Sequence, residues 1–399
     1  MISRASPRFL RALACASAFA FSGSQALMIA LYPLLAETLG LHLSTLIASF
    51  GMGSFLFIFA GPYWARKSDR FGRGRILAVG LLGLAVSLAL IAVPTSAPFS
   101  SGRINLALLL MSRAVYGLVA SSLSPVAQSL QADLAGDEGA AKGMILHSMS
   151  LSLGRVVGLA LIVGFHSSSS SLLWAAAAVA SVVLIAALMS PTPEQSLAVS
   201  TDIPSWRQGL VSSRGILALA FIFTTFVELL NSSLAGSVKM IFDLSSLSSA
   251  GLTARLLLMA SLGIFAVQAL ARVFAKAEFR WGLLIGAGSL LAGAVVFAAA
   301  STLPQLWTAI GFFVVGIGLL PPFYLTALRA QGEKDSYGQR AGLAGSAQTL
   351  GFVAGAMAAA LLFRFPGLQI GPGLIFLSLV LVLLSYRQTS RTMSPVEAS

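Results

Sequence analysis

The amino-acid sequence predicts an all-α membrane protein with twelve transmembrane helices in two related six-helix bundles. Hydrophobic residues make up 57% of the chain and charged residues only 10%, whereas about a quarter of the residues in a typical soluble protein are charged. Apolar runs long enough to cross a lipid bilayer recur from one end of the chain to the other. Glycines, prolines and basic residues also recur in the same order in both halves.

Each of the twelve apolar segments is expected to form one transmembrane helix. Their predicted ranges are 10–36, 42–64, 75–94, 104–130, 140–165, 171–190, 214–238, 248–271, 280–300, 305–329, 340–363 and 367–386. The first segment follows Arg4, Arg8 and Arg11 and could also be a cleavable signal peptide. Because its apolar run continues to Leu35, a retained helix is favoured.

A polar stretch rich in serine and proline, residues 191–213, separates the sixth segment from the seventh. This composition is typical of a linker. The predicted organisation is therefore an N-terminal six-helix bundle (1–190), a cytoplasmic linker (191–213), and a C-terminal six-helix bundle with a short tail (214–399).

The distribution of basic residues predicts the orientation in the membrane. The chain has 25 basic and 13 acidic residues. With a cytoplasmic N-terminus, only Arg103, Lys239, Arg255 and Arg364 fall on the opposite face, against nineteen on the cytoplasmic one. Loops rich in Lys and Arg stay in the cytoplasm, which predicts that both termini lie there. The net positive charge therefore needs no nucleic-acid partner.

The two halves align without gaps over several short stretches. At an offset of 206 residues Gly80 corresponds to Gly286, and at an offset of 197 Pro125 corresponds to Pro322. The second offset also aligns two pairs of glycines with small-xxx-small spacing, which are Gly154, Gly158, Gly351 and Gly355. Such pairs let membrane helices approach closely. Chance similarity between apolar segments is the alternative, but the shared order favours a parallel repeat, as in transporters.

A charged motif lies between the second and third segments and contains Asp69, Arg70, Gly72 and Arg73. The motif resembles the signature G-x-x-x-D-R-x-G-R-R/K of the major facilitator superfamily, with Ala65 and Gly74 as departures. The resemblance implies the major facilitator fold and a conformational latch between Asp69 and Arg73. It also implies that an acid at the end of helix four or five completes this latch. Asp133 is the best-placed match, and a solvated loop acid is the alternative.

Two arginines lie within the predicted membrane helices of the N-terminal half. Arg113 and Gly117 resemble the R-x-x-x-G signature of the proton-coupled branch of this superfamily. A buried arginine usually has a partner or faces water, and Gly117 would let a neighbouring helix approach Arg113. An arginine that only ties helix four to helix one is the alternative. Arg155 is a second fixed positive charge, beside Gly154 and Gly158, although Leu159 stands where the exporter signature has proline.

One acid, Glu228, lies within a predicted helix of the C-terminal half. A low-dielectric site favours the neutral form of a carboxylic acid, so Glu228 could load and release a proton. Pairing with Arg113 or Arg155 is the alternative, and the two roles are compatible. The proton is the expected coupling ion. The single cysteine and the lack of a Cys/His cluster predict no metal site, and no organic cofactor is expected.

The predicted function is proton-coupled export of a drug or small metabolite by a monomer in a bacterial cytoplasmic membrane. Two arginines against one glutamate favour an anionic solute, such as a carboxylate or a siderophore. The candidate cavity residues are Arg113, Arg155, Glu228, Gln25, Tyr116, Asn231, Tyr324 and Gln348. Uptake by the same fold and a non-transporting scaffold are alternatives. An enzyme is disfavoured, because the sequence has no catalytic cluster and no nucleotide-binding glycine loop.

Overall fold

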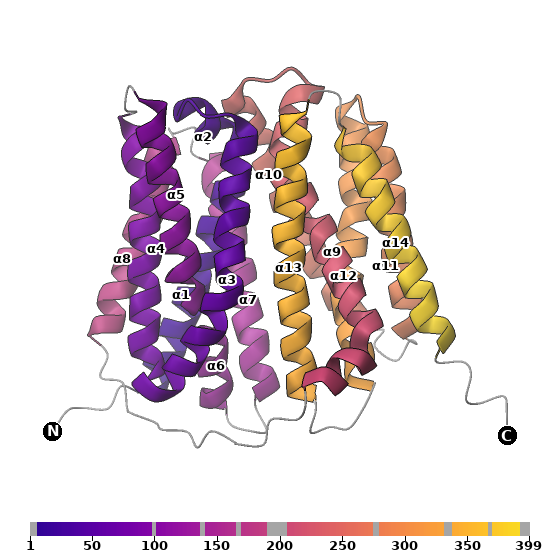
Figure 1. Cartoon of the computed structure of the whole chain (residues 1–399), viewed down its shortest axis with the longest axis horizontal. Coiled ribbons are helices and arrows are strands. Elements are labelled where there is room, and N and C mark those ends of the chain that lie inside the picture. Colours follow the sequence, from indigo (N-terminus) through magenta and orange to yellow (C-terminus); the bar gives the residue numbers. More distant parts are fainter. Residues whose placement is uncertain are drawn as a thin grey trace. The chain divides into compact units, whose positions relative to one another are not determined.

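The computed structural model describes residues 6–97, 101–135, 140–164, 169–189, 206–273, 279–330, 337–365 and 369–391. These residues form helices joined by short turns (Figure 1). The α-helices are α1 (Pro7–Ala30), α2 (Tyr32–Thr38), α3 (Leu43–Phe71), α4 (Arg73–Ser96), α5 (Gly102–Leu118), α6 (Leu123–Ala135), α7 (Ala140–Gly164), α8 (Ser169–Leu188), α9 (Trp206–Ile241), α10 (Ser246–Val273), α11 (Phe279–Ala298), α12 (Leu303–Ala330), α13 (Tyr337–Arg364) and α14 (Ile370–Arg391). One 3-10 turn, η1 (Ala120–Ser122), joins α5 to α6.

Twelve helical spans in the described part of the chain are long and apolar enough to cross a membrane. Each coincides with one of the twelve predicted segments, which confirms the predicted all-α fold class. The chain is therefore a multi-pass membrane protein with twelve spans.

The first predicted segment, 10–36, is not one continuous helix. Helix α1 ends at Ala30, and the short helix α2 starts at Tyr32. Pro33 explains the break, because proline has no N–H to donate to the carbonyl four residues earlier and its ring crowds that carbonyl. The amide of Leu31 is shared between the carbonyls of Leu27 and Met28, at 3.2 and 3.1 Å. Hydropathy alone places no boundary here, because both sides of the break are apolar.

The fourth segment is interrupted as well, three residues before Pro125. The amide of Ser122 donates to the carbonyl of Val119 (3.2 Å), as in a 3-10 turn. In an uninterrupted α-helix it would donate to Leu118. The indole Nε1 of Trp64 in α3 donates to the Leu118 carbonyl instead, at 2.6 Å. A side chain from the second span thus satisfies a backbone group that the interruption leaves open, as burial in a membrane requires.

Backbone packing groups the chain into two compact units. The first unit is Met1–Val199 with Leu244–Leu258, and the second is Ser200–Asp243 with Met259–Ser399. The start of α10 is thus grouped with the first unit, whereas the predicted boundary assigns all of it to the C-terminal bundle. Helix α9 begins at Trp206, inside the predicted linker. The division into 1–190, 191–213 and 214–399 stays a prediction.

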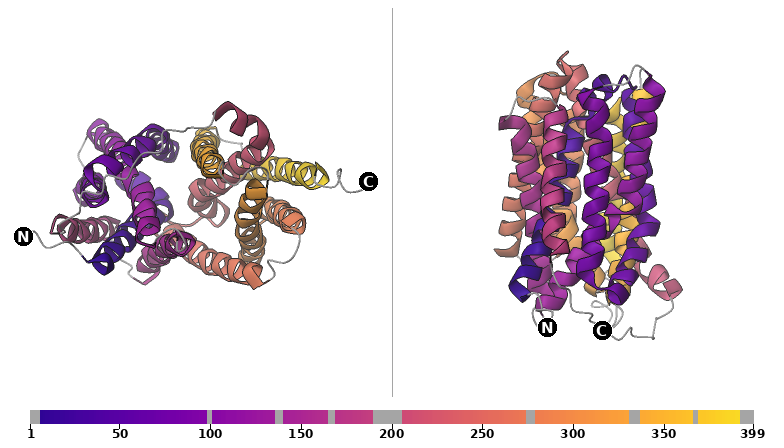
Figure 2. Two further views of the ribbon diagram at one scale, coloured as in Figure 1. Left: turned by 90° about the horizontal axis from the view of Figure 1, so that it is seen from below. Right: turned by 90° about the vertical axis from the view of Figure 1, so that its left-hand side faces the viewer.

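The two units repeat the same helix pairs. In the first unit α1 packs on α7 and α4 packs on α8; in the second α9 packs on α13 and α11 packs on α14. Each of these pairs combines the corresponding spans of its unit. Figure 2 shows the helices of each unit end-on. This pairing supports the parallel repeat predicted from the aligned glycines and prolines.

The predicted glycine pairs lie where helices approach most closely. A Cβ atom on Gly154 would collide with the carbonyl of Phe19, and one on Gly158 with that of Gly23. In the second unit, a Cβ on Gly351 would lie 2.5 Å from the Phe221 carbonyl oxygen, and one on Gly355 would lie 2.6 Å from that of Thr225. Phe221 lies 202 residues after Phe19, and Thr225 lies 202 residues after Gly23. The glycine contacts of the second unit therefore repeat those of the first.

Substitution of Gly351 by alanine is expected to destabilise the second unit. The added methyl group would collide with the backbone of α9, and overpacking of this kind costs about 1–3 kcal/mol. Gly345→Ala is the matched control on the same helix, because a Cβ at Gly345 meets nothing within 4 Å. Thermal unfolding of the purified variants in detergent should show a lower midpoint for Gly351→Ala alone. Equal midpoints for both variants would contradict the close approach of α9 and α13.

Candidate functional site

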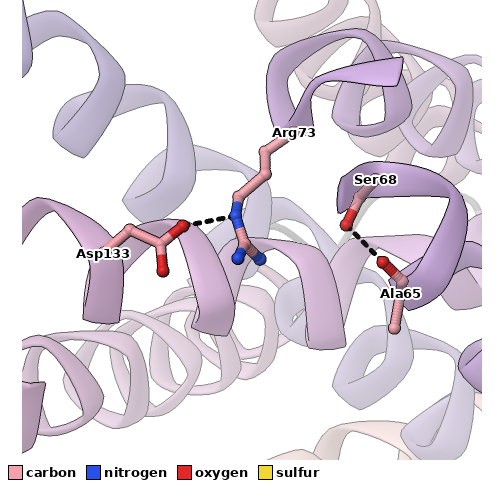
Figure 3. A network of polar contacts seen from close by, with 4 residues as sticks. All are labelled: Ala65, Ser68, Arg73 and Asp133. Atoms are coloured by element: carbon pink, nitrogen blue, oxygen red, sulfur yellow. Dashed lines mark hydrogen bonds and ion pairs between the residues drawn. The ribbon is translucent and has the colours of Figure 1, made fainter. Parts of the chain in front are cut away.

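An ion pair joins α4 to α6 at one end of the first unit. The Nε of Arg73, the first residue of α4, lies 2.5 Å from Oδ2 of Asp133 near the end of α6 (Figure 3). The two side chains are 15% and 33% exposed. The structure thus brings together two residues of the predicted latch that are separated by two membrane spans.

The turn before Arg73 depends on Gly72. Its backbone has φ +89° and ψ 134°, a region that residues with a side chain rarely adopt. Helix α3 ends just before Gly72 and α4 begins just after it, so the turn at Gly72 places Arg73 at the start of α4. Arg70 is exposed on α3. The side chain of Asp69 lies outside the described residues, and its contact with Arg73 stays a prediction.

Arg113 is buried within the first unit, with only 3% of its surface exposed. Its Nη2 donates to the hydroxyls of Ser87 on α4 (3.1 Å) and Ser112 (2.9 Å). The guanidinium also lies over the rings of Phe50 and Tyr116, at 4.3 and 5.1 Å from their centroids. Among the described residues, its Nε has no hydrogen-bond partner. In the part of the chain that the structure describes, hydroxyls and aromatic faces, rather than a carboxylate, surround this charge.

Tyr116 connects the Arg113 environment to α1. Its ring stacks on Phe21, with centroids 5.8 Å apart and planes 4° from parallel. The side-chain amide of Gln25 donates to its hydroxyl. Between Leu13 and Ala30, Gln25 is the one exposed residue of α1. A polar side chain on an otherwise covered helix thus contacts the tyrosine that lies against the buried arginine.

The backbone of Arg113 and Gly117 lies against α3. A Cβ on Gly117 would lie 2.5 Å from the Gly53 carbonyl oxygen. Only glycine fits at this position without moving α3. The predicted close approach at Gly117 therefore involves the backbone of α3.

Glu228 is partly buried on α9 in the second unit. The hydroxyl of Ser232, one turn later, donates to its Oε1 at 2.6 Å. Its Cβ lies 2.7 Å from where a Cβ on Gly355 would be, so Gly355 leaves the room that the glutamate occupies. Asn231 is partly exposed on the same helix. Glu228 belongs to the second unit and Arg113 to the first, and an ion pair between them stays a prediction.

A second glutamine–tyrosine contact lies in the second unit. Nε2 of Gln348 on α13 donates to the hydroxyl of Tyr324 on α12 at 2.5 Å. Tyr324 is 1% exposed, and its ring contacts Phe223 edge to face, with centroids 6.1 Å apart. Arg155 on α7 is exposed. Four of the predicted cavity residues therefore form two local contacts, Gln25 with Tyr116 and Gln348 with Tyr324.

Sequence analysis missed the hydroxyls that hold the two charges. Ser87 is the one hydroxyl residue between positions 76 and 93, and an isolated hydroxyl in an apolar span is a usable signal. Ser232 lies four residues after Glu228, so the two share a helix face. Arg255 is the tenth residue of α10, in the span Ser246–Leu270. Its assignment to the non-cytoplasmic face stays a prediction.

Comparisons with known proteins extend these observations. The family model for the Major Facilitator Superfamily matches residues 13–356. No curated protein sequence matches the chain. The fold is similar to that of three solved transporters, which are the human organic anion transporter MFSD10 (TETRAN), the nucleoside transporter NupG and a D-xylose-proton symporter.

These similarities extend over whole chains at low sequence identity. The TM-scores are 0.68 for MFSD10, 0.72 for NupG and 0.71 for the symporter, with 19%, 11% and 14% identity. The alignments cover 95%, 97% and 95% of this chain, and 99%, 99% and 96% of the respective relatives. At such identities the likeness is one of fold. The family match covers most of the chain, which therefore belongs to the major facilitator superfamily, a family of secondary transporters and not of enzymes.

Proposed function

We propose that this transporter exports a small organic anion in exchange for protons. One observation carries the proposal: within the twelve spans of the described residues, Glu228 is the one acidic side chain. Placing a carboxylate inside a membrane costs free energy, so the few that occur there usually have a function. A protonatable acid at such a position can carry a coupling proton. The hydroxyl of Ser232 donates to Oε1 of Glu228 at 2.6 Å, so this side chain has a polar partner one turn along its own helix.

The fixed charges of the spans support an anionic substrate. Arg113 and Arg155 lie well inside their spans, and arginine keeps its charge in proteins. Glu228 is neutral once it has taken up a proton, so the arginines then dominate the field inside the protein. A carboxylate metabolite or a carboxylate siderophore fits this charge. Two of the similar structures are those of an organic anion transporter and a proton symporter. They share only the fold with this chain, so the proposal depends on this chain's own charges.

The proposed location is a bacterial cytoplasmic membrane, with both termini in the cytoplasm and a monomer as the working unit. The excess of basic residues in the segments next to the spans supports this orientation. It assigns the Arg73–Asp133 ion pair to the cytoplasmic side. In this position the pair would hold the ends of α4 and α6 together in one state of the transport cycle.

Cellular accumulation with and without an uncoupler tests the direction of transport. Cells that express the transporter are loaded with candidate carboxylates and siderophores, and hydrophobic cations serve as the comparison class. An exporter's substrate should rise in the cell when the proton gradient collapses. A fall would instead support proton-coupled uptake, the second candidate. Leu159 stands where the exporter signature has proline, which weakens the assignment to the exporter branch.

The Arg73–Asp133 pair is expected to be coupled in transport. Because both side chains are partly exposed, the interaction should be worth about 1 kcal/mol, or about a fivefold change in rate. Arg73→Ala and Asp133→Ala should each slow initial transport in proteoliposomes by about this factor. The double variant should be no slower than either single variant. Additive losses in the double variant would show that the two residues act separately.

A further inference from the structure

Helix α3 carries a stripe of exposed aromatic side chains, here called the α3 stripe, made of Phe55, Phe59, Tyr63 and Phe71. Their exposed fractions are 47%, 64%, 47% and 49%. Positions four residues apart are neighbours on a helix surface, and a row with this spacing forms a ridge inclined to the helix axis. Lys67 occupies the remaining position of this spacing, so the stripe is a continuous row with one cation in it.

Lys67 is held by its neighbours in the stripe. Its Nζ lies 5.6 Å from the centroid of Tyr63 and 5.0 Å from that of Phe71, distances at which an ammonium group is attracted to a ring face. Arg66 and Arg70, on either side, are both exposed. Three basic residues therefore gather at the end of the stripe, where the span Leu43–Ser68 ends.

Other residues of α3 make its contacts with the first unit. Gly53 lies against Arg113 and Tyr116, Leu56 against Gly117, and the Trp64 indole donates to the Leu118 carbonyl. Ala60 is buried as well. Phe55, Phe59 and Tyr63 remain about half exposed or more, so the helices that α3 packs on within its unit do not cover them.

We propose that the α3 stripe binds an anionic phospholipid. An acyl chain would lie along Phe55, Phe59 and Tyr63, and the phosphate group would sit beside Lys67, with Arg66 and Arg70 adding charge. The order along the helix, apolar within the span and basic at its end, matches the order of chain and headgroup in a lipid. A second copy of the chain is a poorer occupant of the α3 stripe. If the copies met through the same surface, the basic residues of one would lie against those of the other, and an apolar surface would leave the three positive charges without an anion.

Tryptophan quenching by brominated lipids tests this site in the full-length protein. Phe59→Trp places a reporter within the α3 stripe, nine residues before the end of its span. Val179→Trp is the matched control: Val179 is 44% exposed on α8, also nine residues before the end of its span, and α8 has no basic residue in its last turn. Each variant is reconstituted with brominated phosphatidylglycerol or brominated phosphatidylcholine, and quenching beyond that of the parent protein is recorded.

The Phe59→Trp reporter should prefer phosphatidylglycerol over phosphatidylcholine by about fivefold in relative association constant, and Val179→Trp should show no preference. Adding Lys67→Gln should remove most of this preference, whereas Lys67→Arg should keep it. Equal quenching of Phe59→Trp by the two lipids would overturn the proposal. Quenching of Val179→Trp but not of Phe59→Trp would also overturn it, because the α3 stripe would then be covered by protein.

Discussion

Replacing Glu228 with glutamine is expected to abolish gradient-driven transport while leaving the fold intact. Glutamine has nearly the same shape, and its Oε1 can still accept the hydrogen bond that Ser232 now donates to the glutamate at 2.6 Å. It cannot take up a proton. If Glu228 carries the coupling proton, initial transport driven by an imposed pH difference should fall by at least about 100-fold in proteoliposomes. Exchange of labelled for unlabelled substrate at equal pH should persist.

Two controls separate a proton role for Glu228 from a structural one. Glu37→Gln makes the same chemical change in α2, outside the twelve spans, and should leave transport unchanged. Ser232→Ala removes the hydroxyl donor but keeps the carboxylate, so gradient-driven transport should continue with a shifted pH dependence. Loss of both exchange and gradient-driven transport in Glu228→Gln would favour a required ion pair. Retention of both would exclude Glu228 as the coupling group.

The number and type of spans could be predicted because the cost of exposing apolar side chains to water is large and additive along each helix. Helix ends are harder to predict, because single residues decide them. Pro33 ends the run that hydropathy continues to residue 36, and the interruption before Pro125 divides the fourth span. Both prolines act through one backbone hydrogen bond, to which an average over an apolar window is insensitive.

The charged residues of the candidate site could be identified from sequence, but their surroundings could not. Arg113 and Glu228 are conspicuous because a charge in an apolar run is rare. Ser87 contacts Arg113 across 26 positions of sequence, and the rotation of each helix about its axis decides which residues meet. Asp133 was found through resemblance to a family signature rather than through any local pattern.

The internal repeat was only partly visible in the sequence. Its glycines on α7 and α13 align at an offset of 197, but their partners on α1 and α9 are related by 202 residues. Gly23 and Thr225 are different residue types, yet each offers its backbone carbonyl to the facing helix. A contact made through the backbone constrains the glycine opposite and leaves the partner's own side chain free to differ. The repeat is therefore preserved in packing where it is lost in residue identity.

Replacing Arg113 with methionine is expected to slow transport of an anionic substrate strongly without destabilising the protein. Arg113 is 3% exposed and, among the described residues, its guanidinium donates to Ser87 and Ser112. A buried charge without a carboxylate partner costs folding free energy, so an apolar side chain of similar length should leave the thermal midpoint equal or higher. Transport should fall by at least about tenfold, because the variant lacks the fixed positive charge that the proposed function assigns to attracting the anion. Thermal unfolding and proteoliposome flux measure the two effects on one preparation.

The opposite result identifies Arg113 as a structural tie between helices. In that case Arg113→Met would lower the thermal midpoint, and the surviving protein would still transport. Arg113→Lys separates the effect of charge from the effect of shape. Lysine keeps the positive charge, but it lacks the planar guanidinium that lies 4.3 Å from the Phe50 ring centroid and donates to two hydroxyls. If the charge alone matters, the lysine variant transports. If orientation of the guanidinium by the serines matters, Arg113→Lys and Ser87→Ala should both transport poorly, with the Ser87→Ala loss the smaller because Ser112 still holds the arginine.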